Sequence, residues 1–176
     1  MFQLNPDSEL ESLLSAARSA CVAARTAPKG KGKDLLVTAI LSGDEKSVLS
    51  DQMRLIAERE DVASFSRDAG NIDRSPVLLL VGSRKAPLGL KYCGLCGYAD
   101  CAALTAAAGT CAFNTGDLGI ALGSAVSRLA DLRIDNRIMY TVGMAAKELA
   151  LLGDQVELIY GIPLSVSGKS PFFDRS

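Results

Sequence analysis

The chain has 176 residues, a length that suits one domain and allows roughly 70% of the surface of the unfolded chain to be buried. A domain of this size does not need a metal ion merely to hold its core together. Nineteen Lys and Arg residues balance twenty Asp and Glu residues, which gives a net charge of -1, and aromatic residues are few. Because the sequence has no basic stripe, its composition argues against nucleic acid as a partner.

The N-terminal segment MFQLNPDSELESLL carries acidic residues where a secretory signal would be positive, and no apolar run approaches the ~18 residues of a membrane-spanning helix. We therefore expect a cytoplasmic protein with no membrane partner. In a reducing compartment, clustered cysteines are more often metal ligands or redox groups than disulfides, and a total of five cysteines is odd. Histidine is absent from the sequence, so any catalysis must use carboxylates, Lys, Tyr, Cys or a cofactor.

The first predicted element is a helix over residues 8–25. Ser8 and Glu11 match the S-x-x-E capping box, in which the serine oxygen accepts an amide of the first helical turn. Apolar residues follow at helical spacing and place Cys21 on the apolar face. A free cysteine in that position is typical of a small core residue, and a fifth metal ligand is the alternative.

The segment RTAPKGKGKD (25–34) ends this helix, because a proline and two glycines disfavour its continuation. It is predicted to form a cationic loop. Ammonium groups together with glycine amides suit a phosphate dianion, so a flavin or nucleotide phosphate is a candidate ligand of Arg25, Lys29, Gly30, Lys31 and Lys33. A solvated surface loop is the other interpretation. The G-x4-G-K-[ST] spacing of a P-loop is absent.

Strands and helices then alternate along the chain. Their apolar periodicity predicts buried strands at 35–41 and 75–83, a capped helix at 42–60, helices at 117–132 and 141–152, and a last strand at 155–162. We find no linker or internal repeat. The pattern favours a single α+β domain over residues 1–176, in which a mixed sheet is flanked by helices.

Four of the five cysteines lie in the segment 93–111, CGLCGYADCAALTAAAGTC. Their spacing is C-x2-C-x4-C-x9-C, at Cys93, Cys96, Cys101 and Cys111. Four thiolates surround either a tetrahedral zinc ion or an iron-sulfur cluster, but structural zinc sites usually use two C-x2-C pairs and only the first pair here has that form. Glycines at positions 94 and 97 permit close backbone approach, which would let amides point at sulfur. We expect an iron-sulfur cluster, with a structural zinc in a non-catalytic binding protein as the alternative.

Two polar segments of the second half are further candidates. In DLGIALGSA (117–125), Asp117 offers a helix start, and small residues including Gly119, Gly123 and Ser124 allow close approach of a planar ligand or of another helix. The run Asp135, Asn136 and Arg137 is predicted to be a helix cap with a surface ion pair, and the nearby Tyr140 is a candidate proton donor.

The C-terminal segment SGKSPFFDRS places two adjacent phenylalanines, Phe172 and Phe173, beside the charged residues Lys169, Asp174 and Arg175. So much apolar surface needs cover. We expect this tail to dock either on a partner subunit or on its own domain.

The motif CGLCGYADC resembles the CG-x-CG-x3-C core of small four-cysteine domains in corrinoid proteins and bacterial electron-transport subunits, which hold a 4Fe-4S cluster. In those domains the fourth cysteine typically lies farther along the chain than x9, so the resemblance covers Cys93, Cys96 and Cys101 more directly than Cys111. Over nearly the whole chain, the segments RTAPKGKGKD, FSRDAGN, CGLCGYADC, CAFNTGDLGIALGSA, DNRIMYTVGMAA and GIPLSVSGKSPFFDR resemble a family of ferredoxin domain-containing proteins common in anaerobic prokaryotes. That resemblance implies a cluster and specifies no reaction.

The order of elements is also similar to the nitroreductase-like fold, with ARTAPKGKG in place of a flavin-reductase A-x-x-A-P-S-x-x-N stretch, a Gly-rich DLGIALGSA helix and a last strand ending in GIPLS. Such proteins are generally homodimers with flavin mononucleotide (FMN) at the interface. The resemblance implies a homodimer and an FMN site drawn from Arg25, Lys29, Gly30, Lys31, Gly119, Gly123 and Ser124, although no clear R-R-S-x-R phosphate motif is present. Together, these observations predict a 4Fe-4S electron-transfer protein and a flavin-linked oxidoreductase that exchanges electrons with a donor or acceptor.

Overall fold

A computed structural model describes residues 6–173 of the chain. The elements, in chain order, are α1 (Pro6–Thr26), the 3₁₀ turn η1 (Gly30–Gly32), β1 (Leu36–Ser42), α2 (Asp44–Glu60), α3 (Ala63–Asp73), β2 (Val77–Arg84), α4 (Cys101–Ala106), α5 (Ala112–Asp131), β3 (Asp135–Asn136), α6 (Tyr140–Glu148) and β4 (Val156–Ser165). None of the helices within residues 6–173 is both long and apolar enough to span a bilayer.

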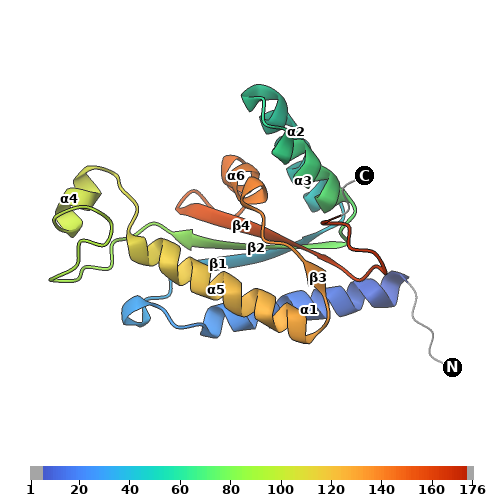
Figure 1. Cartoon of the computed structure of the whole chain (residues 1–176), viewed down its shortest axis with the longest axis horizontal. Coiled ribbons are helices and arrows are strands. Elements are labelled where there is room, and N and C mark those ends of the chain that lie inside the picture. Colours follow the sequence, from blue (N-terminus) through green and yellow to red (C-terminus); the bar gives the residue numbers. More distant parts are fainter. Residues whose placement is uncertain (1–5, 174–176) are drawn as a thin grey trace.

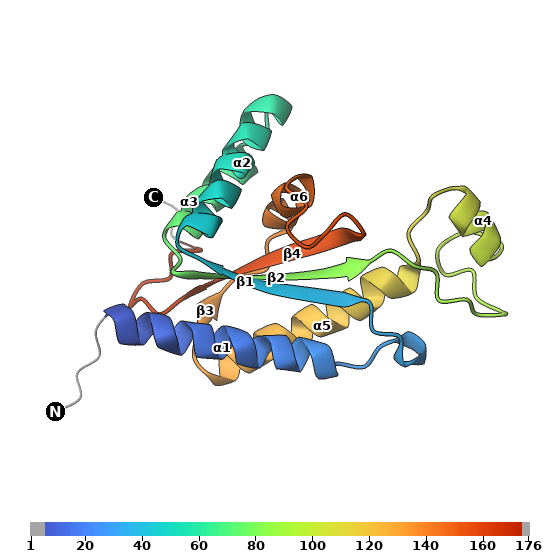
Figure 2. The same cartoon turned by 180° about the vertical axis from the view of Figure 1, so that it is seen from behind.

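The sheet has the strand order β1-β2-β4-β3, and helices cover both of its faces. Helices α1 and α5 lie on one face, while α2, α3 and α6 lie on the other (Figures 1 and 2). All three strand pairings are antiparallel, which corrects the prediction of a mixed sheet. The physical reason is the helix α3, which was not predicted. Because α2 leads away from the sheet and α3 leads back, the chain enters β2 at the end where it left β1.

Two apolar cores form on the two faces of the sheet because the side chains of a strand alternate in direction. In β2, Val77, Leu79 and Val81 pack toward α1 and α5, while Leu78 and Leu80 pack toward the other helices. All five side chains are fully buried. The strand is therefore central to both layers, as its continuous apolar sequence predicts.

Helix α6 packs unusually close to β4. A Cβ atom placed on Gly143 of α6 would overlap the backbone carbonyl of Ile159, and one placed on Gly161 of β4 would overlap the side chain of Val142. The backbone N–H of Met139, just before α6, also donates to Gly161 O at 2.8 Å. The absence of two side chains thus allows this helix to lie directly on the strand.

Two predicted helix starts are wrong. Helix α1 begins at Pro6, so Ser8 lies inside the helix and is not its N-cap. A proline is well suited to the first turn of a helix because its missing N–H would have no partner there. Helix α5 begins at Ala112 with Cys111 as its N-cap residue, so Asp117 lies within the helix rather than at its start.

The run 135–137 is neither a helix cap nor an ion pair within the described part of the chain. Asp135 and Asn136 form β3 and pair with Ser165 and Leu164 of β4. Arg137 donates from Nη1 to Phe172 O at 3.1 Å, and its guanidinium lies 5.2 Å from the ring centroid of the next residue, Phe173. Backbone pairing and an aromatic contact therefore take the place of the predicted cap and ion pair, while the buried Asp135 Oδ2 has no hydrogen-bond partner among the described residues.

The C-terminal tail docks on its own chain as far as Phe173. Phe172 is 3% exposed and belongs to the core beneath α2, α3 and α6. Arg74 at the end of α3 donates from Nη2 to Pro171 O at 3.2 Å. Asp174 and Arg175, the charged residues that follow the two phenylalanines, lie outside the described residues.

Candidate functional site

The cysteine lobe, residues 86–111, joins the end of β2 to the start of α5 and protrudes from one end of the sheet (Figure 1). Two polar contacts attach it to the rest of the chain. The backbone N–H of Ala86 donates to Oδ1 of the buried Asn114 at 3.1 Å, and Lys85 Nζ donates to Ala108 O at 2.5 Å. Lys85 also lies 3.5 Å from Glu157 of β4. The lobe is therefore tethered at its base and near the end of α4.

All four clustered cysteines line one pocket of this lobe. Cys111 is buried, Cys96 and Cys101 are half-buried, and Cys93 is exposed. The pocket has an empty volume of about 440 Å³, part of which is open to solvent, and its apolar walls include Leu88, Leu104 and Phe113. The four residues predicted to act together therefore lie around one space, and their joint role as ligands stays a prediction.

The segment between the first two cysteines is a tight turn. The backbone N–H of Gly97 donates to Gly94 O at 2.9 Å, and the two glycines have φ values of 84° and 99°, respectively. Residues with a side chain are strained at such positive φ values. A Cβ on Gly97 would meet nothing within 4 Å. The backbone conformation of this turn therefore requires both glycines, and the approach of their amides to sulfur stays a prediction.

Two helices present the other two cysteines. Asp100 caps α4 by accepting the backbone N–H of Ala103 at 2.8 Å, which places Cys101 in the first turn. Cys111 is the N-cap residue of the twenty-residue helix α5. The N-terminus of a helix favours a negatively charged group, so the position of Cys111 suits a thiolate.

A single metal ion does not match the spacing of these side chains. Among residues 6–173, no three Cys, Asp or Glu side chains converge closely enough to hold one ion. Thiolates around a zinc ion, each about 2.3 Å from the metal, lie within about 4 Å of each other. In a 4Fe-4S cluster, each of the four cysteines binds a different iron, so the thiolate sulfur atoms stand farther apart. The four thiols line one pocket with partly apolar walls, a donor set that fits an iron-sulfur cluster and leaves zinc as the alternative.

Cys21 lies apart from the lobe, on α1. It packs against the core between α1, α5 and the sheet, and it does not line the pocket of the four other cysteines. Burial raises the pKa of its thiol, although a hydrogen bond with Thr38 and the charge of Arg25 oppose this effect. A raised pKa favours the neutral thiol over the thiolate, as expected of a core residue.

Two cationic side chains of the loop 25–34 form hydrogen bonds within the chain. Arg25 Nη1 donates to Asp34 Oδ2 at 2.6 Å and to Leu36 O at 3.0 Å. Lys29 Nζ donates to three backbone carbonyls at the end of α1, those of residues 24, 25 and 27, and so acts as a C-terminal cap. In the described part of the chain, the side chains of Lys31 and Lys33 form no hydrogen bond or ion pair, and both are exposed.

The remaining predicted cofactor-binding residues do not all lie together: Gly30 and Ser124 make contacts between α5 and the end of α1 or the loop after it, whereas two glycines of α5 do not. The backbone N–H of Gly30 donates to both carboxylate oxygens of Asp117, at 3.1 and 3.0 Å, and Ser124 Oγ donates to Ala23 O at 2.9 Å. Gly119 and Gly123 are exposed, and a Cβ on either would meet nothing within 4 Å. Helix packing therefore accounts for Ser124, while the two glycines leave open space on the outer side of α5.

The cationic loop also touches the wall of the cysteine pocket. A Cβ on Gly30 would lie 2.9 Å from Leu88 Cδ2 and 3.0 Å from Phe113 Cδ1, and both of these side chains line the pocket. The two sites predicted separately from the sequence are therefore neighbours at one end of the molecule.

Several residues that build the lobe were not predicted. Asp100 stands before the alanine-rich run CAALTAAA, which is an N-cap pattern that would have located α4. Lys85 and Asn114 carry no such signal, because their partners are backbone groups of the lobe that only the fold brings near.

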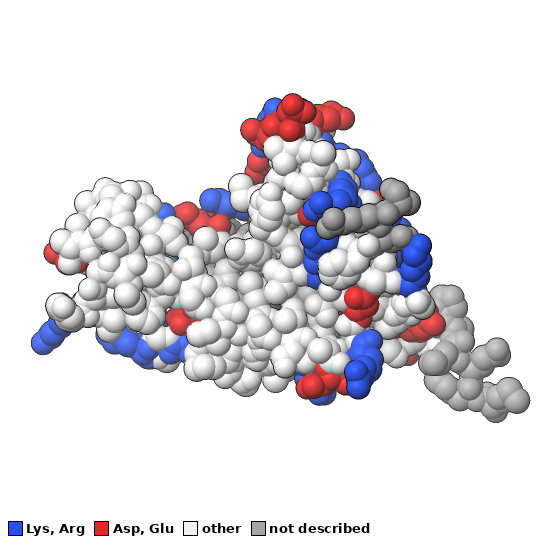
Figure 3. All heavy atoms as spheres, in the orientation of Figure 1, with Lys and Arg blue, Asp and Glu red and all other residues white. Residues whose placement is uncertain are grey.

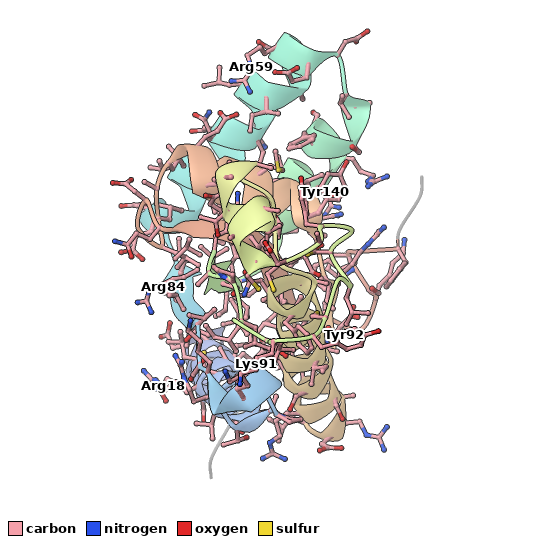
Figure 4. The ribbon with its side chains drawn as sticks, turned by 90° about the vertical axis from the view of Figure 1, so that its left-hand side faces the viewer. Arg18, Arg59, Arg84, Lys91, Tyr92 and Tyr140 are labelled. Atoms are coloured by element: carbon pink, nitrogen blue, oxygen red, sulfur yellow. The ribbon has the colours of Figure 1, made fainter. Side chains whose placement is uncertain are left out.

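Tyr140, the candidate proton donor, lies away from this pocket. It stands at the start of α6, and its ring makes an edge-to-face contact with Phe65 of α3 at a centroid distance of 6.0 Å. Figure 4 shows Tyr140 on the side of the sheet that carries α6. The structure therefore does not join Tyr140 to the cysteines.

Comparison with known proteins supports both the family and the fold. The model of the family described as "Uncharacterized protein containing a ferredoxin domain (DUF2148)" matches residues 107–175, a region that includes Cys111 and excludes the three other pocket cysteines. An uncharacterized protein of Archaeoglobus fulgidus is 39% identical over 178 residues, which cover 97% of this chain and 95% of that protein.

Solved nitroreductases share the fold at low sequence identity. The FMN-dependent nitroreductase NfnB from Mycobacterium smegmatis, solved in complex with NADPH, has a TM-score of 0.61 and 13% identity over 90% of this chain and 81% of that chain. A nitroreductase with bound FMN from Desulfitobacterium hafniense has a TM-score of 0.60 and 18% identity over 95% of this chain and 81% of that chain. The predicted nitroreductase-like fold is confirmed, and the description of the family suggests a redox function. The chain belongs to the ferredoxin domain-containing DUF2148 family and has the fold of the nitroreductases.

Proposed function

We propose that this protein is an iron-sulfur electron-transfer protein in which Cys93, Cys96, Cys101 and Cys111 hold a 4Fe-4S cluster. The observation that carries the proposal is the placement of all four cysteines around one pocket. When bound, the cluster would supply one-electron chemistry. The C-x2-C-x4-C-x9-C spacing, which contains only one C-x2-C pair, supports a cluster over the structural zinc that is the alternative.

The residues around the pocket suit such a group in two ways. Apolar side chains, including Leu88 and Leu104, exclude water from the buried side, and a low dielectric and limited solvent access influence a cluster's potential. Cys93, on the exposed side, leaves one edge within reach of a redox partner.

The test is the response of the anaerobically purified protein to reduction. We expect a brown protein whose broad visible absorbance bleaches when dithionite is added and which then gives a paramagnetic resonance signal. Zinc is colourless and has no redox chemistry because it is d¹⁰. A colourless protein with no signal after reduction would contradict the proposal.

We further propose that the protein binds FMN and forms a homodimer. The nitroreductase with bound FMN from Desulfitobacterium hafniense has the same fold, and the open side of α5 at Gly119 and Gly123 leaves room for a planar ring. Because Arg25 and Lys29 have partners within the chain, we assign the phosphate contact to Lys31. The flavin would couple one-electron steps at the cluster to two-electron chemistry, as expected of a flavin-linked oxidoreductase.

FMN binding is tested by fluorescence quenching with the cluster-loaded protein. At ~100 μM FMN, a site with a dissociation constant of ~10 μM would be mostly filled. We expect quenching by the wild type, weaker binding by Lys31→Ala, and no change in the control Arg18→Ala, which removes an exposed cation of α1. The absence of quenching would leave an iron-sulfur protein without a flavin.

A further inference from the structure

The surface beside Cys93 is both apolar and accessible. Tyr92 is 97% exposed and Leu95 is 73% exposed, the two highest values among the large hydrophobic side chains of residues 6–173. These residues flank the exposed Cys93 in the chain, whereas Cys111 is buried. Figure 4 shows Tyr92 and Lys91 on the lobe, at the end of the molecule that faces the viewer. Large apolar groups exposed together mark an interaction site more often than isolated ones.

The lobe is nearly free of charge. Residues 86–111 contain two charged side chains, Lys91 and Asp100, and the carboxylate of Asp100 caps α4. In the space-filling view, the lobe at the left is a largely uncharged surface (Figure 3). Lys91 lines the cysteine pocket, is exposed, and forms no ion pair with any carboxylate of residues 6–173. Within the described residues, Lys91 is thus an unpaired cation that precedes the two exposed apolar residues in the same exposed segment of the lobe.

We propose that Lys91, Tyr92 and Leu95 form the docking surface for a small electron-carrier protein. The carrier would present an apolar surface with a carboxylate next to its own redox group. In the complex one electron leaves the reduced carrier, which is oxidised, and the lobe's redox group is reduced by that electron, with no bond formed or broken. This inference rests on the proposed function.

The chemistry of the patch favours that occupant over others. Weak electron-transfer encounters use small interfaces, below about 1,200 Å² in total, and charge complementarity raises their association rate. A two-fold contact between copies of this chain would place the same patch on both sides, so neither side would supply a free carboxylate for Lys91, because Asp100 of the lobe caps α4. Nucleic acid would need several cations rather than one.

The test measures binding and electron transfer separately, with a small acidic plant-type ferredoxin as the probe. Iron content and visible absorbance are first compared for the wild type, Lys91→Glu and the double variant Tyr92→Ser with Leu95→Ser. The matched controls are Arg18→Glu and Val22→Ser, which make the same changes at exposed positions of α1. The dissociation constant is then measured by calorimetry, and the reduction rate is measured with the ferredoxin and with methyl viologen.

We expect Lys91→Glu to weaken ferredoxin binding about tenfold at low ionic strength, with the difference vanishing at 1 M salt, where the screening length is about 3 Å. The double variant should weaken binding at both salt concentrations. Neither change should alter the rate with methyl viologen, because that small molecule needs no docking surface, and both controls should resemble the wild type.

Three results would overturn the inference. The first is equal binding by Lys91→Glu and Arg18→Glu, which would remove Lys91 from the docking surface. The second is an equal loss of rate with ferredoxin and with methyl viologen, which would place the effect on the redox group itself. The third is conversion of a dimer to a monomer by the double variant, which would assign the patch to self-association. A wild type without iron would instead refute the proposed function, and the docking inference with it.

Discussion

Cys111 is buried and Cys21 is half-buried, and the structure places them in different surroundings. Cys111 lines the pocket with the three other clustered cysteines, while Cys21 packs on α1 against the core. We therefore predict that Cys111→Ser loses most of the iron chromophore of the anaerobically purified protein and that Cys21→Ser retains it. Visible absorbance per chain measures both. If Cys21→Ser bleached the chromophore and Cys111→Ser did not, the fourth ligand would be wrongly assigned.

The sequence identified Asp117 as a candidate helix start, but in the structure it holds the cationic loop. Its carboxylate accepts the backbone N–H of Gly30 and so fixes the cationic loop against α5. Hydrogen bonds to charged groups contribute about 1.5–3 kcal/mol, so we predict that Asp117→Ala lowers the free energy of unfolding by about that amount. Urea unfolding checks this value.

The control for Asp117 is Asp131→Ala at the exposed end of the same helix. Asp131 lies 3.8 Å from Arg128, and exposed pairs of this kind contribute about 0–1 kcal/mol. Equal destabilisation by the two variants would show that the contact with Gly30 does not hold the loop.

Helix α6 depends on two glycines for its position on β4. A Cβ on Gly143 would overlap the carbonyl oxygen of Ile159, which belongs to the backbone and cannot rotate away. Overpacking a rigid core costs about 1–3 kcal/mol and occasionally more, so we predict that Gly143→Ala destabilises the fold by at least about 3 kcal/mol. Thermal unfolding measures the change.

Gly116→Ala in α5 is the matched control for Gly143→Ala. Nothing lies within 4 Å of a Cβ at Gly116. Alanine is better than glycine in a helix by about 0.8–1 kcal/mol, so this variant should be slightly more stable than the wild type. Similar losses in both variants would mean that helical glycines, rather than the close contact with β4, set the stability.

The elements that sequence predicted well are those with long apolar periodicity. The sequence predicted the strands β1, β2 and β4 and the helices α1, α2, α5 and α6 close to their observed positions. The exceptions are the starts of α1 and α5, which lie before the predicted ones. The two-residue strand β3 could not be predicted, because its pairing with β4 is a long-range contact. Helix α3 separates two predicted elements and decides that β1 and β2 are antiparallel. Its omission is why the sheet was expected to be mixed.

The sequence likewise predicted only part of the candidate site. The spacing of the four cysteines identified the pocket residues, because ligands of one group lie close together along a short segment. The cofactor residues of the loop 25–34 were inferred from charge alone. Charge does not reveal that Arg25 pairs with Asp34 or that Lys29 caps α1, since those partners depend on the folded path of the chain.

At the scale of the whole molecule, the assembly state is a prediction of its own. We expect sedimentation to give twice the 18.4 kDa mass of one chain. The C-terminal tail gives no support for a dimer, because Phe172 is buried in the core of its own chain. A mass of 18.4 kDa at all protein concentrations would contradict the proposed homodimer and would leave the cluster proposal untouched.

The most direct test of the central proposal is the content of iron and acid-labile sulfide in the anaerobically purified protein. A 4Fe-4S cluster held by the four cysteines of the pocket requires about four irons and about four sulfides per chain, with no zinc. One zinc per chain with neither iron nor sulfide would contradict it.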